Sequence, residues 1–297
     1  MKINKKKSIK LQLNQLNFNV PNDTMGIDIG QSLTKLAHVE SENELNLILL
    51  STEKEQDDLM DILDPIKLKF KNFNFTGGRA FNVFNEYSKE SNANLLDEFH
   101  SNAKGIEILY NLYKKKKLPK SLIINIGTGT SILLKNQNIV HLGGSALGGG
   151  FFMGLIKVLF NLSDFKNALK LAEKGSRYNV DLKVSDIYDK NDHRVDRIFK
   201  EYTAASFGKI LSDSKPKEIK KEDFLNALIC LIGENIGTIA NLFAKDNEVS
   251  NLVFCGGFLI ENIILKRILS TVTKLHHHNP IFLKNSEYCG AIGALLS

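Results

Sequence analysis

The chain has 297 residues, of which 43% are hydrophobic and 24% are charged, a balance typical of a folded protein of one or two domains. No apolar run is expected to span a membrane, and the N-terminus lacks the apolar core and cleavage site of a secretory signal. Cys230, Cys255 and Cys289 form neither a metal-binding spacing nor an even disulfide set. We therefore expect a cytoplasmic protein with no integral membrane segment.

The net charge of +6 is unevenly distributed along the chain. The first ten residues carry five lysines and no acid, so the rest of the chain is nearly neutral. No aromatic residues alternate with this run or with the lysines at 114–117, so we expect no nucleic-acid partner. Residues 1–24 are interpreted as a basic tail, either a solvated arm or a weak anchor for anionic surfaces. The alternation in "IKLQLNQLNFNV" (9–20) predicts an extra edge strand within it.

The stretch "MGIDIGQSLTKLAHVE" (25–40) predicts a strand, a tight glycine turn and a second strand. Asp28 ends the first strand, where a carboxylate costs free energy unless it is paired. Lys35 follows across a glycine turn whose backbone N–H groups face one way, which favours a phosphate site. A plain hairpin with an Asp–Lys surface pair remains the alternative.

Further strands are predicted at 46–52 and 72–78, with a helix between them at 57–70. Residues 97–117 place apolar side chains at helical spacing, and Pro119 marks a break after them.

A second block, "SLIINIGTGTSILL" (121–134), repeats the order of strand, glycine turn and strand. The later elements are helices at 151–174 and 222–245, a strand at 251–257 that ends in paired glycines, a helix at 261–272, and a glycine-rich helix start at 287–297. Two halves of similar design predict a duplicated architecture with a nucleotide between them. We place the first domain at residues 25–118 and the second at 119–297.

This ordered set resembles the acetate and sugar kinase/actin-like ATPase superfamily, and within it the type II (eukaryotic-like) pantothenate kinases. The resemblance covers about residues 24–297 and rests on these stretches: "GIDIGQSLTKL", "TGGRAF", "DEFHSNAKGIEILY", "NIGTGTSIL", "GGSALGGGFFMGL", "AEKGSRYNVDLKVSDIY", "TAASFGK" and "EYCGAIGALL". It implies an α/β fold of two actin-like ATPase (ribonuclease H-like) domains with a nucleotide cleft between them.

The resemblance also implies the residues that hold ATP and its Mg²⁺. Asp28 would lie near the metal, as suits a hard cation held by one or two carboxylates and phosphate oxygens. The implied nucleotide-binding residues are Gly30, Gln31, Ser32, Lys35, Gly127, Thr128, Gly129, Thr130, Gly148, Gly149, Gly150, Gly256, Gly257, Gly290 and Gly293.

Glu98 falls where the family has its catalytic carboxylate, which takes the proton from the pantothenate hydroxyl. The alternative is a glutamate that complements the dipole of a helix N-terminus. Thr128 would touch the substrate, with a turn-stabilising role as its alternative. His141, Gly143 and Gly144 complete the implied substrate site.

Two positions depart from the family pattern. Gln31 stands where the first phosphate turn usually has a second glycine. His141 stands where the family has an arginine that faces the pantothenate carboxylate.

The expected activity is ATP-dependent phosphorylation of pantothenate to 4'-phosphopantothenate, the first step of coenzyme A biosynthesis. The resemblance further implies a homodimer and leaves room for feedback by acyl-CoA or CoA. The alternatives are a same-fold kinase for another small hydroxylated substrate, a catalytically inactive nucleotide-binding regulator, and an ATPase activator. The last needs cysteines that bind an iron–sulfur cluster between subunits, and these three have other contexts.

Overall fold

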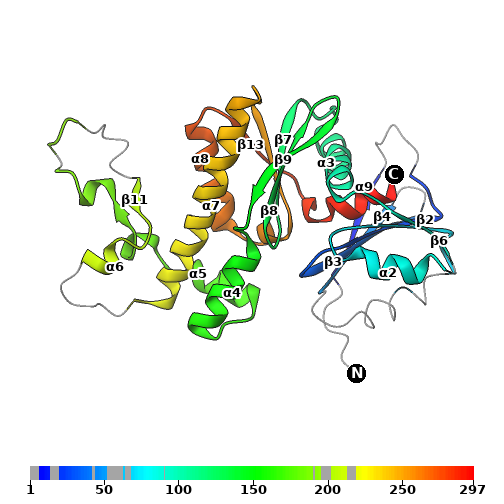
Figure 1. Cartoon of the computed structure of the whole chain (residues 1–297), viewed down its shortest axis with the longest axis horizontal. Coiled ribbons are helices and arrows are strands. Elements are labelled where there is room, and N and C mark those ends of the chain that lie inside the picture. The colour runs from blue at the N-terminus through cyan, green and yellow to red at the C-terminus, as the bar shows by residue number, and fades with distance from the viewer. Residues whose placement is uncertain are drawn as a thin grey trace.

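The computed structural model describes residues 7–13, 20–41, 44–51, 63, 68–89, 91–189, 191–194, 202–212 and 219–297. The helix expected at 57–70 lies almost entirely outside these residues. The described part contains two mixed sheets, each with helices packed against it, and a small lobe at one end of an elongated molecule (Figure 1).

The first sheet has six strands in the order β1-β4-β3-β2-β5-β6. The strands are β1 (Lys7–Gln12), β2 (Thr24–Ile29), β3 (Leu33–Ser41), β4 (Glu44–Ser51), β5 (Asn72–Thr76) and β6 (Asn92–Leu95). Strands β1 to β4 pair antiparallel, whereas β2, β5 and β6 run parallel. Strand β2 is buried along its whole length because it lies inside the sheet and is covered on both faces.

The edge strand expected within residues 9–20 is confirmed in part, since β1 covers Lys7–Gln12 and residues 14–19 lie outside the described residues. Strand β1 pairs antiparallel with β4. Two side-chain hydrogen bonds also join the strands: Lys10 Nζ donates to Glu44 Oε1 at 2.7 Å, and Ser8 Oγ donates to Asn46 Oδ1 at 2.6 Å. The interpretation of residues 1–24 as a free basic arm is therefore wrong for Lys7–Gln12, because these residues complete a sheet.

The second sheet has five strands in the order β13-β12-β7-β8-β9. The strands are β7 (Ser121–Ile126), β8 (Thr130–Lys135), β9 (Ile139–Ser145), β12 (Asn251–Cys255) and β13 (Asn279–Phe282). Strands β7, β8 and β9 form an antiparallel meander, and β12 and β13 then add parallel to β7. The first sheet has the same arrangement, with β2, β3 and β4 as the meander and β5 and β6 as the parallel strands. The duplicated architecture is confirmed, and among the described residues β1 is the strand without a counterpart in the second sheet.

Two helices lie between the sheets, α3 (Glu98–Lys114) and α9 (Cys289–Leu295). They approach closely because glycines stand at the crossing: a methyl group at Gly105 would lie 1.9 Å from the Cys289 carbonyl oxygen, and one at Gly293 1.8 Å from that of Ser101. Gly26 of β2 meets the Ala291 carbonyl oxygen in the same way. The end of the chain thus returns to the first sheet (Figure 1).

The remaining helices within the described residues are α2 (Ala80–Tyr87), α4 (Gly149–Phe160), α5 (Phe165–Ala172), α6 (Lys209–Ser212), α7 (Lys221–Asp246) and α8 (Ile263–Leu275). The helix expected at 151–174 is two helices, because the chain leaves α4 at Asn161 in a left-handed conformation and Asp164 caps α5 by accepting the Asn167 N–H at 2.6 Å.

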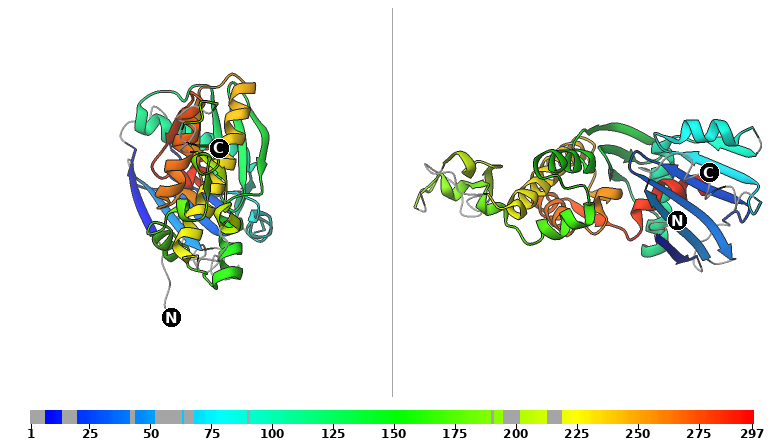
Figure 2. Two further views of the ribbon diagram at one scale, coloured as in Figure 1. Left: turned by 90° about the vertical axis from the view of Figure 1, so that its left-hand side faces the viewer. Right: turned by 90° about the horizontal axis from the view of Figure 1, so that it is seen from below.

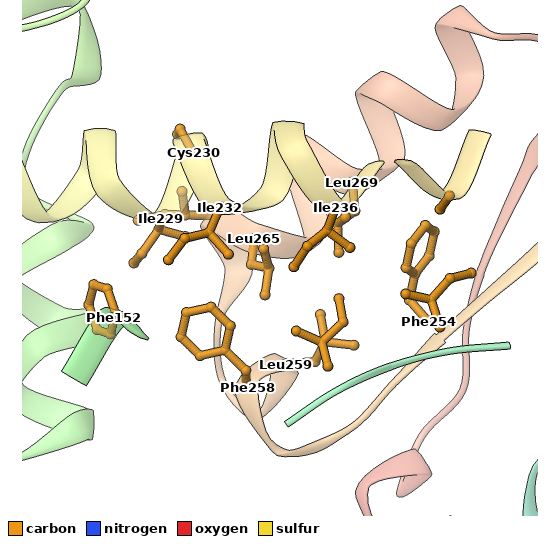
Figure 3. Close-up of a cluster of buried hydrophobic side chains, with 14 of the residues drawn as sticks. Phe152, Ile229, Cys230, Ile232, Ile236, Phe254, Phe258, Leu259, Leu265 and Leu269 are labelled. Carbon is orange, nitrogen blue, oxygen red and sulfur yellow. The ribbon is translucent and has the colours of Figure 1, made fainter. Parts of the chain in front are cut away.

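Helix α7 forms the centre of the core beside the second sheet. Its buried residues, among them Ile229, Ile232 and Ile236, pack with Phe254 of β12 and Phe258 after it (Figure 3). By length and composition alone, α7 could cross a membrane, so the expectation that no run is long enough was wrong. Most of its apolar stretch is nevertheless buried inside the protein, which is the arrangement of a core helix.

A small lobe extends from the far side of the second domain (Figure 2). It contains β10 (Leu182–Lys183), β11 (Thr203–Ala205) and α6. Buried Arg177 holds it to α7, since its guanidinium donates to Asp181 at 2.7 Å and to both carboxylate oxygens of Glu234 at 2.6 and 2.9 Å. Such a bidentate pair fixes orientation as well as charge.

Candidate active site

The candidate active site begins at the carboxyl ends of three parallel strands of the first sheet. Asp28 lies near the end of β2, Gly77 and Gly78 follow β5, and Glu98 follows β6 as the first residue of α3. Parallel strands end at one edge of a sheet, which brings these residues together.

Asp28 and Lys35 face each other across the hairpin of β2 and β3. They are direct partners in the strand register, and Lys35 Nζ donates to Asp28 Oδ2 at 3.0 Å. Both side chains are almost buried, at 10% and 13% exposure. The alternative of an Asp–Lys pair on the surface therefore does not describe these residues. An exposed ion pair would add little stability, whereas this one is nearly buried.

Two glycines form a cradle around the Asp28 carboxylate. A methyl group at Gly77 would lie 2.6 Å from Oδ1, and one at Gly290 would lie 2.8 Å from Oδ2. Gly77 also has φ +95°, which favours glycine. These positions leave the carboxylate oxygens free of side-chain crowding, and one such carboxylate suits a hydrated Mg²⁺ that also binds phosphate oxygens.

Glu98 lies beside this pair. A methyl group at Gly78 would lie 3.9 Å from Glu98 Oε2. The Glu98 carboxylate therefore lies next to the backbone of the turn after β5. Partial burial raises the pKa of Glu98, the Asp28 and Asp97 carboxylates raise it further, and Lys35 opposes the shift. A carboxylate with a raised pKa is better matched to proton abstraction near neutral pH.

Asp97 explains how Glu98 is positioned. It is the N-cap of α3, and its side chain accepts the His100 N–H at 2.7 Å. Since Asp97 performs the capping, Glu98 in the first turn is not used as the cap, and its carboxylate lies near Gly78, Asp28 and Lys35.

The second glycine turn lies between β7 and β8 and is held by the start of α4. Gly149 N–H donates to the Gly127 carbonyl at 2.8 Å, and Gly150 N–H donates to the Thr128 carbonyl at 2.9 Å. A methyl group at Gly148 would lie 2.6 Å from the Thr128 carbonyl oxygen. Thr130 adds a hydrogen bond from its hydroxyl to the Leu147 carbonyl at 2.8 Å, so the turn and the helix start form one unit.

The two glycine turns meet across the cleft. Ser32 Oγ and Thr128 Oγ1 are 3.2 Å apart, although 96 residues separate them in the sequence. Gly257, after β12, lies against the first turn too, since a methyl group there would be 3.0 Å from a Leu33 methyl group. Gly30, whose N–H donates to the Leu33 carbonyl at 3.1 Å, closes the first turn.

A pocket of about 220 Å³ opens beside the paired glycines. Its lining comes from the ends of β12 and β13, the turns after them, and one residue of α8: Phe254, Gly256, Leu259, Ile260, Glu261, Lys266, Phe282, Leu283, Lys284, Asn285, Ser286 and Glu287. Gly256 has φ +105° and packs on the Ile126 carbonyl, so glycine is required there.

Of the residues expected to bind the substrate, the structure brings His141 close to Glu98 but not Gly143 and Gly144. His141, on β9, stacks on Phe99 of α3 with ring centroids 4.3 Å apart and planes at 7°, next to Glu98. Gly143 instead faces the Phe243 ring of α7, and Gly144 packs on the Thr130 carbonyl, so these two strand residues are not brought to Glu98.

Two nucleotide-site expectations also need comment. Gln31 is exposed and leaves the turn open. Gly293 lies in the contact of α9 with α3, and this helix packing is sufficient to explain why the residue is a glycine. Gly77, Gly78 and Phe99 were not among the expected site residues. For the glycines, the signal was present as a pair directly after an apolar strand.

Comparisons with known proteins show which family this chain belongs to. The model of the Fumble family matches residues 43–297. A type II pantothenate kinase of Oceanobacillus iheyensis is 36% identical over 92% of this chain and 98% of its own length. That of Bacillus anthracis is 34% identical, with coverage of 92% and 96%.

The chain belongs to the type II pantothenate kinase family. Solved structures confirm the actin-like fold of two domains expected for this family. The activator of the 2-hydroxyisocaproyl-CoA dehydratase from Clostridium difficile with bound ADPNP aligns with a TM-score of 0.59 at 19% identity over 92% of both chains. A ROK family glucokinase from Streptomyces griseus in complex with glucose and AMPPNP aligns with a TM-score of 0.54 at 11% identity, over 92% of this chain and 97% of its own.

Proposed function

We propose that this member of the type II pantothenate kinase family transfers the γ-phosphoryl group of ATP to the primary hydroxyl of pantothenate, the first step of coenzyme A biosynthesis. The observation that carries the proposal is the position of Glu98. Its carboxylate lies beside the Asp28–Lys35 pair, and its pKa is raised by burial and by Asp28.

In this mechanism Glu98 takes the proton from the attacking hydroxyl. Lys35 provides a positive charge beside the phosphates, and the backbone N–H groups of the turns at Gly30 and Gly127–Gly129 orient them. Such positioning and charge stabilisation are the main contributions of a protein to phosphoryl transfer. Mg²⁺, when bound, would neutralise phosphate charge, and Asp28 is the residue that would hold it.

We assign the adenosine of ATP to the pocket beside Gly256 and Gly257. Gly257, which directly follows the lining residue Gly256, lies against Leu33 of the first turn, and Ser32 of that turn lies 3.2 Å from Thr128 of the second. These neighbours support the assignment because they place the pocket next to both phosphate turns. The start of α4, Gly148–Gly150, would support the second turn from behind. Thr128 and the edge of the His141 ring would contact the substrate.

The alternatives are less well supported. An inactive regulator would not need Asp28, Lys35 and Glu98 together in one partly buried cluster. An activator with an iron–sulfur cluster between subunits would need accessible cysteines, whereas Cys230, Cys255 and Cys289 are all buried. A same-fold kinase for another small hydroxylated substrate is the second candidate, and His141 in place of an arginine is the observation that favours it.

Family membership also supports three further proposals. The chain forms a homodimer, acts in the cytoplasm, and responds to acyl-CoA or CoA as a feedback ligand. Size-exclusion chromatography with light scattering tests the first, and inhibition by acetyl-CoA at fixed ATP tests the last.

A coupled ATP assay tests the main proposal. The purified chain is given ATP, Mg²⁺ and either pantothenate or a panel of sugars and hydroxy acids. We expect ADP formation with pantothenate and a phosphorylated product of the corresponding mass. Turnover of a sugar without turnover of pantothenate would overturn the assignment.

A further inference from the structure

The two glycine turns of the cleft touch through one pair of side chains. Ser32 Oγ and Thr128 Oγ1 lie 3.2 Å apart, and either hydroxyl can be the donor. Ser32 belongs to the turn between β2 and β3, and Thr128 belongs to the turn between β7 and β8. The contact therefore joins the two halves of the molecule at the place where both turns face the cleft.

The Thr128 hydroxyl is directed at the first turn by the branched shape of its own side chain. A methyl group at Gly150 would lie 2.5 Å from Thr128 Cγ2, so the Thr128 methyl group packs on the backbone at the start of α4. Since both substituents of a threonine Cβ turn together about χ1, this packing also fixes the hydroxyl, which faces Ser32. The Gly150 N–H donates to the Thr128 carbonyl at 2.9 Å and holds the backbone in place.

The first turn is held on the other side of the contact. The Gly30 N–H donates to the Leu33 carbonyl at 3.1 Å, which closes the turn around Ser32. Leu33 also lies against Gly257, since a methyl group there would be 3.0 Å from Leu33 Cδ1. The first turn thus meets the second domain at two points, one apolar and one made by the two hydroxyls.

The phosphates of ATP, as proposed above, need the space between these turns. Lys35 Nζ would lie 3.5 Å from a methyl group at Gly30, so a positive charge stands beside the first turn. Hydroxyls bond a phosphate oxygen at about 2.5–2.7 Å, and two donors to one oxygen then stand roughly 4 Å or more apart. At 3.2 Å the Ser32 and Thr128 hydroxyls are too close for that. Their contact and a phosphate held between them exclude each other.

We propose that the contact of Ser32 with Thr128 is a latch, which closes the phosphate site and which ATP must open. The proposal rests on the proposed function and concerns the binding of ATP before any transfer. The latch joins two neutral, exposed groups. A hydrogen bond of that kind changes an equilibrium by only about two- to tenfold. ATP can displace it, because charged phosphates bond to both turns more strongly than the hydroxyls bond to each other.

An engineered disulfide tests the contact and its competition with ATP. In the double variant Ser32→Cys/Thr128→Cys the two sulfurs take the places of the hydroxyls, and diamide takes up both thiol hydrogens as the sulfurs join. We expect rapid cross-linking in buffer, followed by the loss of two reactive thiols. The three native cysteines are buried, and each single variant shows their background. With a non-hydrolysable ATP analogue and Mg²⁺ at about 100 times Kd, the rate should fall about 100-fold, since only protein without the analogue can cross-link.

Two substitutions at Thr128 separate its hydroxyl from its methyl group. Thr128→Val keeps the branched shape against Gly150 and removes the latch, so the Kd of the ATP analogue in calorimetry should fall by about two- to tenfold. Thr128→Ser keeps the hydroxyl but loses the methyl group that directs it, so its Kd should lie between those of Thr128→Val and the wild type. Thr238→Val, at an exposed threonine of α7, is the matched control and should leave the Kd unchanged.

Four outcomes would overturn the latch. Equal cross-linking rates with and without the analogue would show that the hydroxyls stay together when phosphates bind. A double variant that never cross-links would show that the turns do not touch in solution. A higher Kd in Thr128→Val would assign the Thr128 hydroxyl to the phosphates themselves. If the double variant cross-links but the wild type does not bind the analogue at all, the contact is real, and the proposed function fails together with the latch.

Discussion

At the scale of single residues, the site depends on three ionisable groups in one partly buried cluster. Asp28 and Lys35 form a close pair, which leaves Glu98 as the carboxylate with the raised pKa. Neighbouring carboxylates whose environments differ in this way are a common means of assigning an acid–base role.

Replacing Glu98 by Gln tests that role directly. The amide keeps the size of the side chain but cannot accept the proton, so kcat should fall by about 10²–10⁴-fold. Binding of an ATP analogue, measured by calorimetry, should stay within about threefold of the wild type. A variant that retains most of its activity would show that Glu98 only complements the helix dipole.

The pKa shift of Glu98 gives a second prediction, on stability. Because its pKa is raised in the folded state, ionisation of Glu98 destabilises the fold as pH rises through that pKa. Glu98→Gln should therefore unfold at higher urea than the wild type at pH 8, and the difference should vanish near pH 4. In the wild type, the pKa that governs the acid limb of the kcat/KM profile should lie above about 4.3, the pKa of an ordinary glutamate. A variant that is less stable at pH 8 would contradict the assigned cause.

Local sequence predicted part of this cluster and missed the rest. The apolar runs around the glycine turn predicted the hairpin of β2 and β3, whereas the pairing of Asp28 with Lys35 had been only the alternative to a phosphate site. Glu98 lies 70 residues from Asp28, so family resemblance was needed to connect them. The stack of Phe99 on His141 left no local signal, because it depends on how α3 lies against the second sheet.

At the scale of elements, β1 is an addition to the duplicated plan. It covers the edge of β4, an exposed position that would otherwise present unpaired backbone groups to other chains. Ile9 and Leu11 of β1 pack partly against the core between the sheets.

Two truncations separate the strand from the residues before it. Deletion of residues 2–12 should lower the free energy of unfolding by roughly 1.5–3 kcal/mol, the value of two half-buried aliphatic side chains, and should promote aggregation. Deletion of residues 2–6 removes three lysines and should leave stability and kinase activity unchanged. Urea titration and light scattering measure both effects. Equal behaviour of the two truncations would mean that β1 adds nothing to the sheet.

The contact between α3 and α9 requires a glycine at position 105. Gly105→Ala would place a methyl group 1.9 Å from the Cys289 carbonyl oxygen, so the helices must move apart. We expect a loss of about 1–3 kcal/mol or more in the free energy of unfolding. Gly154→Ala is the matched control, because a methyl group there meets nothing within 4 Å, and the gain in helix propensity is up to about 1 kcal/mol. Similar effects of both variants would contradict the close approach.

Element prediction succeeded where strands were apolar and failed where they were short or polar. The hairpins beginning at β2 and β7 follow from apolar runs broken by glycine. Strand β6 reads Asn-Ala-Asn-Leu, β9 contains Gly143 and Gly144, and β13 contains Pro280, so each lacks the usual strand signal. Their places in the sheets come from pairing with neighbours distant in sequence.

At the scale of the whole molecule, ATP is expected to bind groups from both halves. The adenosine pocket belongs to the second half, whereas Lys35 and Gly30 belong to the first. A non-hydrolysable ATP analogue at about 100 times its Kd should stabilise the fold by about 2.7 kcal/mol. Adenosine, which lacks phosphates, should bind far more weakly in calorimetry. Equal affinities would show that the glycine turns do not hold the phosphates.

The return of α9 to the first sheet has a consequence for biosynthesis. On a ribosome the first sheet emerges early, yet α9, the helix that covers β2, is translated after all the other helices and strands of the described residues. The usual order, in which an N-terminal domain is finished while the rest is still being made, does not apply to this chain. The second half completes its own core around α7 first, and the first half becomes complete only after α9 has left the ribosome.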